Sequence, residues 1–220
     1  MFRLIAALLL ATPVLAVPAA LVTDPPMNTA YPADLMPLLI ASHGANMNGR
    51  IYLAEGKGPH PTMLLLHGFP GNEQNGDVAQ AARRAGWNVI LFHYRGAWGS
   101  QGAFSIHNAI DDTQVVFDWA RDPANAAKYR IDPKRIVIAG HSMGGFMTVQ
   151  TAAHNPGLAG VILIDAWNPA ASAAGLSNPQ AQAAIVAGLA ESMPPISGII
   201  AQGLLAEMAA NAAGWNNEAQ

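Results

Sequence analysis

The middle of the chain alternates between short apolar runs and longer stretches in which apolar and polar positions mix. Four runs are largely aliphatic or β-branched, which is typical of strands buried on both faces of a sheet; they span 62–66, 88–92, 136–138 and 160–164. The stretches between them predict helices over 73–85, 106–120 and 145–154. This alternation predicts an α/β fold with a doubly wound, mostly parallel sheet and helices on both faces. Asp111 and Asp112 are interpreted as part of a solvated helix face.

The segment before the first buried run predicts a hairpin. Residues 17–36 are rich in Pro and Ala and are expected to form an extended lead-in with little structure of its own. Residues 38–42 and 50–54 are expected to be two strands. The pair Asn48-Gly49 between them is typical of a tight turn, so the two strands are predicted to be antiparallel.

The segment after residue 169 changes in character. It is rich in Ala and contains Gly, Asn, Gln and the paired prolines Pro194 and Pro195. Short helices are expected around 178–192 and 196–213, and no further strand is predicted. The chain is therefore divided into a core over 37–169 and a helical tail or partial cap over 170–220.

The first sixteen residues have the pattern of a secretory signal peptide. Arg3 supplies a positive charge, and residues 4–11 form an apolar stretch too short to span a bilayer. Val14 and Ala16 offer small residues at the −3 and −1 positions of a cleavage site. The alternative is an uncleaved membrane anchor. The signal-peptide interpretation predicts a secreted or periplasmic protein with no stable membrane span after cleavage.

Composition and charge exclude several function classes. The formal net charge is −3, so no basic patch for nucleic acid is indicated. The chain has no cysteine, which excludes a disulfide, a thiolate metal site and a Cys nucleophile. The sequence implies no cofactor and no metal.

The sequence Gly140-His141-Ser142-Met143-Gly144 fits the pattern G-x-S-x-G. It follows a predicted strand and opens a predicted helix, which is the context in which this pattern forms a nucleophile elbow. Chance is the alternative, because only three positions are fixed. Within the strand-turn-helix context, Ser142 is the candidate nucleophile for acyl transfer, next to the positive end of a helix.

A glycine-rich loop, His67-Gly68-Phe69-Pro70-Gly71, follows the strand predicted over 62–66. Pro70 has no N–H group, so the backbone N–H of Phe69 is the candidate donor. Together with the backbone N–H of Met143 it would form an oxyanion hole. An ordinary glycine turn is the alternative. His67 is expected to be a structural residue that forms hydrogen bonds under this loop.

These two motifs together resemble the α/β-hydrolase superfamily, in detail the branch related to prolyl oligopeptidase and the dienelactone hydrolases. The resemblance covers about residues 38–168. The segment 94–102 resembles the Y-R-G-x-x-x-S-x-G loop of that branch, although His93 stands where an Asp is usual, and 140–148 resembles its G-H-S-M-G-G-F-M motif. The resemblance implies a serine hydrolase whose Ser is followed along the chain by an acid and then a His.

The other two triad residues are not matched. His154 is the only His after Ser142, and a helix over the residues between them would separate the two by roughly 18 Å. Asp165, at the end of the strand predicted over 160–164, is a candidate acid, with a loop-capping role as its alternative. His93 is a remote candidate for a recruited base. The last two strands of the family are not found in this chain.

Two functional hypotheses follow. The first is a serine hydrolase of ester or peptide bonds, incomplete or inactive as given, whose base would lie beyond residue 220. The second is a non-catalytic hydrolase-like binding domain. The expected partner is a small-molecule ester or peptide, and a sheet without its last strands predicts self-association through an exposed edge.

Overall fold

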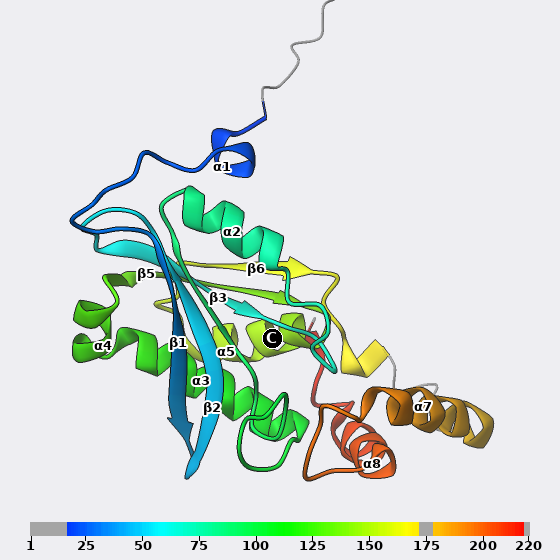
Figure 1. Ribbon diagram of the computed structural model, residues 1–220. Helices are drawn as coiled ribbons and strands as arrows, with labels where there is room; N and C mark the ends of the chain where they lie inside the picture. The colour runs from blue at the N-terminus through cyan, green and yellow to red at the C-terminus, as the bar shows by residue number, and fades with distance from the viewer. Residues whose placement is uncertain (1–16, 172–177, 218–220) are drawn as a thin grey trace, which may run out of the picture.

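The computed structural model describes residues 17–171 and 178–217, whose centre is one six-stranded sheet. Its strands are β1 (Asp34–Ser42), β2 (Ala45–Leu53), β3 (His60–Leu66), β4 (Asn88–Phe92), β5 (Ile131–His141) and β6 (Gly160–Ile164). They are arranged in the order β1-β2-β4-β3-β5-β6. The pairs β1–β2 and β2–β4 are antiparallel and the other three pairs are parallel. The predicted mostly parallel, doubly wound sheet is confirmed (Figure 1).

Helices cover both faces of this sheet. The helices of the described residues are α1 (Ala19–Val22), α2 (Gly76–Arg84), α3 (Ile106–Arg121), α4 (Pro123–Lys128), α5 (Met143–His154), α7 (Pro179–Ser192) and α8 (Ala201–Asn211). Helix α2 lies on one face, and α3 and α5 lie on the other (Figure 1). Figure 1 also shows α7 and α8 together beyond the ends toward which the parallel strands point. No helix within the described residues is long and apolar enough to cross a membrane.

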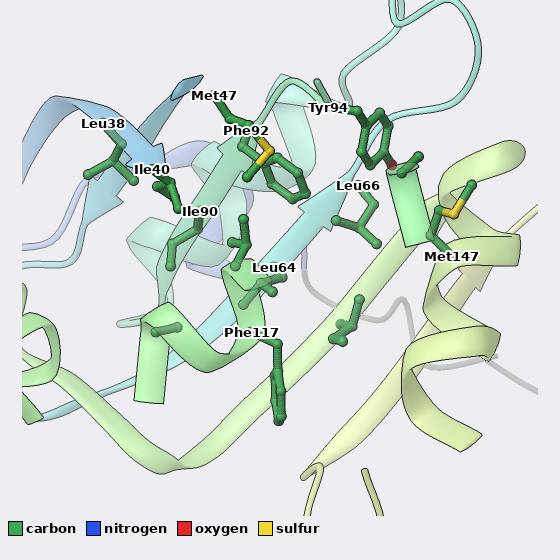
Figure 2. Packing of buried hydrophobic residues seen from close by; sticks show 14 of the residues in the cluster. Leu38, Ile40, Met47, Leu64, Leu66, Ile90, Phe92, Tyr94, Phe117 and Met147 are labelled. Carbon is green, nitrogen blue, oxygen red and sulfur yellow. The ribbon is translucent and has the colours of Figure 1, made fainter. Parts of the chain in front are cut away.

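Strand alternation produces two apolar layers. In β3, Met63 and Leu65 face the cluster under α2, whereas Leu64 and Leu66 face the larger cluster on the side of α3 and α5. Figure 2 shows Leu64 and Leu66 among side chains from β4 and α3, such as Phe117. Because both faces of β3 are buried, its sequence is apolar at nearly every position, which is the signal that located it.

The hairpin is present, but its turn is not where the sequence pattern put it. Strands β1 and β2 are joined by His43 and Gly44, which have φ angles of 46° and 82°. Two successive positive φ angles are typical of a two-residue hairpin turn of type I′. The pair Asn48-Gly49 lies inside β2. A Cβ atom on Gly49 would stand 2.8 Å from the carbonyl oxygen of Leu91, so this glycine permits the close approach of β4.

Strand β6 is at the position expected, but it is not buried. Val161, Ile162 and Leu163 are 45–48% exposed. Within the described residues β6 pairs only with β5, so its other edge is unpaired, and α5 is the helix that contacts it. Its continuous apolar run is therefore a correct signal for a strand and a wrong one for its burial.

Short helices lie near both ends of the part of the chain that the structure describes. The lead-in includes the one-turn helix α1, and β1 begins at Asp34, a few residues earlier than predicted. Helices α7 and α8 occupy the two stretches where helices were expected. The expected signal peptide, residues 1–16, lies outside the described residues.

Candidate active site

Ser142 occupies a sharp turn between β5 and α5. Its φ and ψ angles are 52° and −118°, a backbone conformation that residues other than glycine rarely adopt. The turn is held from two directions: the N–H of Ser142 donates to the carbonyl of Ile164 at 3.0 Å, and its own carbonyl accepts from the N–H of Trp167 at 2.9 Å. Hydrogen bonds to the segment after β6 thus stabilise the strained residue.

Gly140 and Gly144 flank Ser142, and a side chain at either position would collide with nearby backbone atoms. A Cβ atom on Gly140 would stand 2.1 Å from the carbonyl oxygen of Gly144, and one on Gly144 would stand 2.4 Å from the carbonyl oxygen of Leu66. Both distances are far below van der Waals contact with backbone atoms that cannot move aside. The spacing G-x-S-x-G is therefore the spacing that lets α5 leave β5 directly over β3.

Parallel pairing brings the glycine-rich loop to the serine. Leu66 pairs with Gly140, so β3 and β5 end at the same edge of the sheet. A Cβ atom on Gly68 would lie 3.0 Å from the Cβ and 3.4 Å from the Oγ of Ser142. The backbone just before Phe69 therefore passes directly beside the Ser142 hydroxyl.

Ser142 lines a cavity of about 170 Å³ together with Phe69 and Met143. The structure thus brings to one place the three residues that the sequence singled out as nucleophile and oxyanion donors. The other lining residues are apolar, and they are Ile106, Trp167, Leu189, Leu204 and Met208. No charged side chain belongs to this lining, so the cavity is suited to an uncharged, apolar group.

A partial cap was one of the expectations for residues 170–220, but the sequence did not identify which of its residues would line the cavity. Leu189 belongs to α7, and Leu204 and Met208 belong to α8. In this alanine-rich segment, only the positions of the larger apolar residues could indicate which helix face is buried. They identify a buried helix face but do not indicate that this face would close over the serine.

A hydrogen-bonded group of side chains lies under the glycine-rich loop. His67 Nδ1 is 2.7 Å from the carbonyl oxygen of Gly68, and His67 Nε2 is 3.2 Å from Nδ1 of His93. The Tyr94 hydroxyl donates to the His67 carbonyl at 3.1 Å, and the Trp98 indole N–H donates to the Pro70 carbonyl at 2.7 Å. His67 is 4% exposed, in agreement with the structural role expected for it.

Burial keeps both imidazoles uncharged at neutral pH. Burial lowers the pKa of His67 to about 4, although its bond to Gly68 acts in the opposite direction. Burial also lowers the pKa of His93 to about 4, with a further contribution from the adjacent His67. Burial raises the pKa of Tyr94, so its hydroxyl keeps the proton that it donates.

The segment after β4 is anchored by a buried ion pair. Arg95 Nε is 2.6 Å from Asp112 Oδ1, the Arg95 N–H donates to Asp112 Oδ2 at 2.8 Å, and the Ser42 hydroxyl donates to Oδ1 at 2.6 Å. The interpretation of Asp112 as part of a solvated face is wrong, because its side chain is fully buried. Asp111, which is 57% exposed, does lie at the surface.

The remaining candidates lie away from the cavity. Asp165 is exposed at the end of β6 with a φ angle of 45°, and it is not among the cavity-lining residues. His154 ends α5, where its Nδ1 bonds to the carbonyl of Gln150. His93 is bonded to His67. Among the described residues, no histidine lines the cavity and no group of three or more His, Asp or Glu could hold a metal.

An open, mostly parallel sheet with a serine at a strand-turn-helix junction defines the α/β-hydrolase class of fold. A sequence model of the alpha/beta hydrolase fold matches residues 61–194, so the chain belongs to the α/β-hydrolase fold family. The finer likeness to the prolyl oligopeptidase and dienelactone hydrolase branch stays a prediction.

Curated relatives match only part of the chain. An uncharacterized protein of Mycobacterium tuberculosis is 26% identical over 133 residues, which cover 60% of this chain and 46% of the relative. The lysophosphatidylserine lipase ABHD12 of Danio rerio is 34% identical over 89 residues, which cover 39% and 21%. The chain thus spans about half the length, or less, of these relatives.

Solved structures agree with the fold. The carboxylesterase EstE1, cloned from a metagenomic library, has a TM-score of 0.53 at 22% identity and matches 67% of this chain and 50% of its own. The α/β hydrolase GrgF of Penicillium has a TM-score of 0.56 at 18% identity and matches 83% and 66%. At such identities the likeness concerns the fold alone.

Proposed function

We propose that this chain contains the nucleophile and oxyanion hole of a serine hydrolase that acts on esters with an apolar acyl group. The observation that supports this most strongly is the cavity, onto which Ser142 opens together with Phe69 and Met143. The uncharged walls favour an aliphatic or aromatic acyl group, and the lipase and esterase names among similar proteins favour an ester over a peptide.

The chemistry would begin with attack of the Ser142 Oγ on the acyl carbon. A bond forms between Oγ and carbon, and the carbonyl electron pair moves to oxygen, where the N–H groups of Phe69 and Met143 donate to it. A base accepts the serine proton and returns it to the leaving alcohol as the ester C–O bond breaks. Water then releases the acid and restores the hydroxyl.

The base is the part of this mechanism that the described cavity lining does not supply. We infer that a histidine positioned by an acid would serve as this base, and no histidine is among the described residues that line the cavity. Asp165 lies at the same sheet edge as Ser142, but its side chain is exposed and does not line the cavity, so it is a weak candidate for that acid. Without a base, the oxyanion hole and binding alone leave roughly 10³–10⁴-fold acceleration over water.

The test compares the protein with Ser142→Ala in two assays. We expect a fluorophosphonate probe to label Ser142, and p-nitrophenyl butyrate or hexanoate to be hydrolysed faster than a charged ester such as p-nitrophenyl succinate. Ser142→Ala should lose both the label and the turnover. An unchanged rate in Ser142→Ala would exclude this serine as the nucleophile.

A non-catalytic binding domain is the second candidate, favoured by the absence of a histidine from the described cavity lining. It predicts that neither probe reacts while p-nitrophenol or a fatty acid still binds, quenching the fluorescence of Trp167 at the cavity wall.

We also propose export through the signal peptide at residues 1–16. Mass spectrometry of the mature protein should find a new N-terminus after Ala16. An intact Met1 in the purified protein would contradict cleavage.

A further inference from the structure

We propose that His93 and His67 act as positioning residues that fix the direction of the Gly68–Phe69 peptide, so that the Phe69 N–H faces the Ser142 cavity. The inference rests on the proposed function, since it explains how one of the two oxyanion donors is held in place. It concerns side chains that do not line the cavity themselves.

The direction of the Gly68 carbonyl determines the direction of the Phe69 N–H. The Gly68 carbonyl and the Phe69 N–H belong to the same planar peptide unit, which is trans, so they point in opposite directions. His67 Nδ1 lies 2.7 Å from that carbonyl oxygen on the buried side. Holding the carbonyl toward His67 therefore turns the N–H away from it, on the side where Phe69 lines the cavity.

The hydrogen bonds determine where each proton lies. The Gly68 carbonyl can only accept, so His67 Nδ1 must carry the proton of a neutral ring. His67 Nε2 is then an acceptor, and its contact with His93 Nδ1 at 3.2 Å is a hydrogen bond only if His93 donates. Both rings are thus set in the Nδ1–H form, and His93 selects the form of His67 that the carbonyl needs.

Residues 93–100 also hold the glycine-rich loop on the other side of Phe69. The carbonyl of Pro70 accepts from the Trp98 indole, and the carbonyl of His93 accepts from the Ser100 hydroxyl at 2.8 Å. The loop is therefore fixed on both sides of Phe69 by residues 93–100. A bond to the Gly68 carbonyl also polarises the peptide and makes its N–H a better donor.

Substitutions can separate this role from simple packing. His67→Asn places a side-chain amide near the site of Nδ1 and can still donate to Gly68, whereas His67→Phe fills the same space without a donor. The corresponding pair at position 93 is His93→Asn, which keeps a donor toward His67, and His93→Phe. His154→Phe at the exposed end of α5 is the matched control.

The experiment combines kinetics with nitrogen NMR on the whole chain. For p-nitrophenyl butyrate we expect His67→Phe and His93→Phe to lower kcat by about 10-fold to 100-fold with KM nearly unchanged, a part of the 10²–10³-fold cost of deleting a donor. His67→Asn should recover most of kcat, and His154→Phe should match the unsubstituted protein. Equal kcat in folded His67→Phe, or no difference between Asn and Phe at position 67, would overturn the inference.

The NMR measurement tests the inference without turnover. Imidazole nitrogen shifts at neutral pH should show both His67 and His93 protonated at Nδ1, and His93→Phe should release His67 from that form. A His67 protonated at Nε2 overturns the inference whatever the rates are. If Ser142 proves unreactive while both rings are in the Nδ1–H form and the Phe69 amide signal shifts in His67→Phe, the positioning stands and the proposed hydrolysis fails.

Discussion

The carboxylate of Glu207, on α8, lies 2.7 Å from Nδ1 of His107 in the first turn of α3. The same carboxylate accepts hydrogen bonds from the backbone N–H groups of Ile106 and His107, each at 3.0 Å. A negative charge at the N-terminus of a helix is favourable, so Glu207 caps α3 from another element. Ile106 and the α8 residues on either side of Glu207, Leu204 and Met208, all line the cavity, so this contact holds two of its walls together.

Removing this carboxylate should loosen the cavity wall. We expect Glu207→Ala to lower the free energy of unfolding by about 1–2 kcal/mol, since two helix N–H groups lose their acceptor. The KM for p-nitrophenyl hexanoate should rise more than that for p-nitrophenyl acetate. Glu191→Ala, on the exposed surface of α7, is the control. Unchanged denaturation and KM in Glu207→Ala would show that α8 is held by its apolar contacts alone.

We expect a large loss of stability when one partner of the buried ion pair between Arg95 and Asp112 is removed. Asp112→Ala leaves Arg95 and Ser42 without their shared acceptor, and breaking such a pair by removing one partner costs about 3–5 kcal/mol. Urea denaturation followed by fluorescence measures this. Asp111→Ala, at the exposed neighbouring position, should change stability by less than about 0.5 kcal/mol. Equal effects of the two substitutions would contradict the assignment.

The glycines of the serine turn predict a contrast with a glycine in open space. Gly144→Ala would drive a Cβ atom to 2.4 Å from the Leu66 carbonyl oxygen, so we expect loss of fluorophosphonate labelling and of stability. Gly188→Ala, in α7, meets nothing within 4 Å and should stabilise by about 0.5–1 kcal/mol. Thermal denaturation of the two variants measures the difference. A well-folded, labelled Gly144→Ala protein would show that the turn can shift.

Acid should destabilise the fold through the histidine pair. The pKa of His67 is about 4 when folded and 6.5 in the unfolded reference, so the unfolded chain binds the extra proton between these values. Stability therefore falls as the pH drops from about 6.5 toward 4, by up to about 3 kcal/mol for His67. Arg50 on β2 contributes to the low pKa of both rings.

The measurement is the free energy of unfolding against pH for the protein and for His67→Asn. Carboxyl groups titrate in both proteins, so the difference between the two curves reports His67 together with its effect on the adjacent His93. We expect the curve of His67→Asn to be flatter between pH 6.5 and 4. Parallel curves would mean that folding does not lower the pKa of His67.

The edge strand predicts self-association, which we propose occurs by pairing of β6 with β6 of a second copy. The strand has the sequence Gly-Val-Ile-Leu-Ile, without the charge or proline that protects natural edges. Ile162→Lys should keep the protein monomeric in sedimentation velocity, whereas Leu39→Lys on β1, the opposite edge of the sheet, should not. A concentration-independent monomer before any substitution would contradict this proposal.

Local patterns predicted the fold because the strands β3, β4 and β5 each carry their own signal. The apolar runs of β3 and β4 and the glycines around Ser142 are contiguous in sequence, so burial and steric need are visible without tertiary contacts. The hairpin turn was misplaced because Asn48-Gly49 has two uses, a turn or the close approach of another strand, and only the partner strand decides between them.

The rest of the site depends on partners that are distant along the chain. Asp112 looks solvated until Arg95 and Ser42 meet it from other segments. The pairing of His67 with His93, and of Glu207 with the start of α3, likewise joins residues 26 and 100 positions apart. No periodicity encodes such pairs, because neither member is unusual in its own neighbourhood.

The cavity has two sources: the serine and its donors lie at the edge of the sheet, whereas much of its wall comes from α7 and α8. Residues 178–215 join the core through polar links, such as Glu207 to α3 and the Ser197 N–H to the Gly96 carbonyl, and through apolar residues such as Leu204 and Trp215. We therefore expect that exchanging residues 178–215 as a cassette would change which acyl groups fit the cavity, because Ser142, Phe69 and Met143 lie outside this segment. A swapped cassette that keeps Glu207 should accept acyl groups of new shape while Ser142 reacts at its former rate with a minimal ester such as p-nitrophenyl acetate.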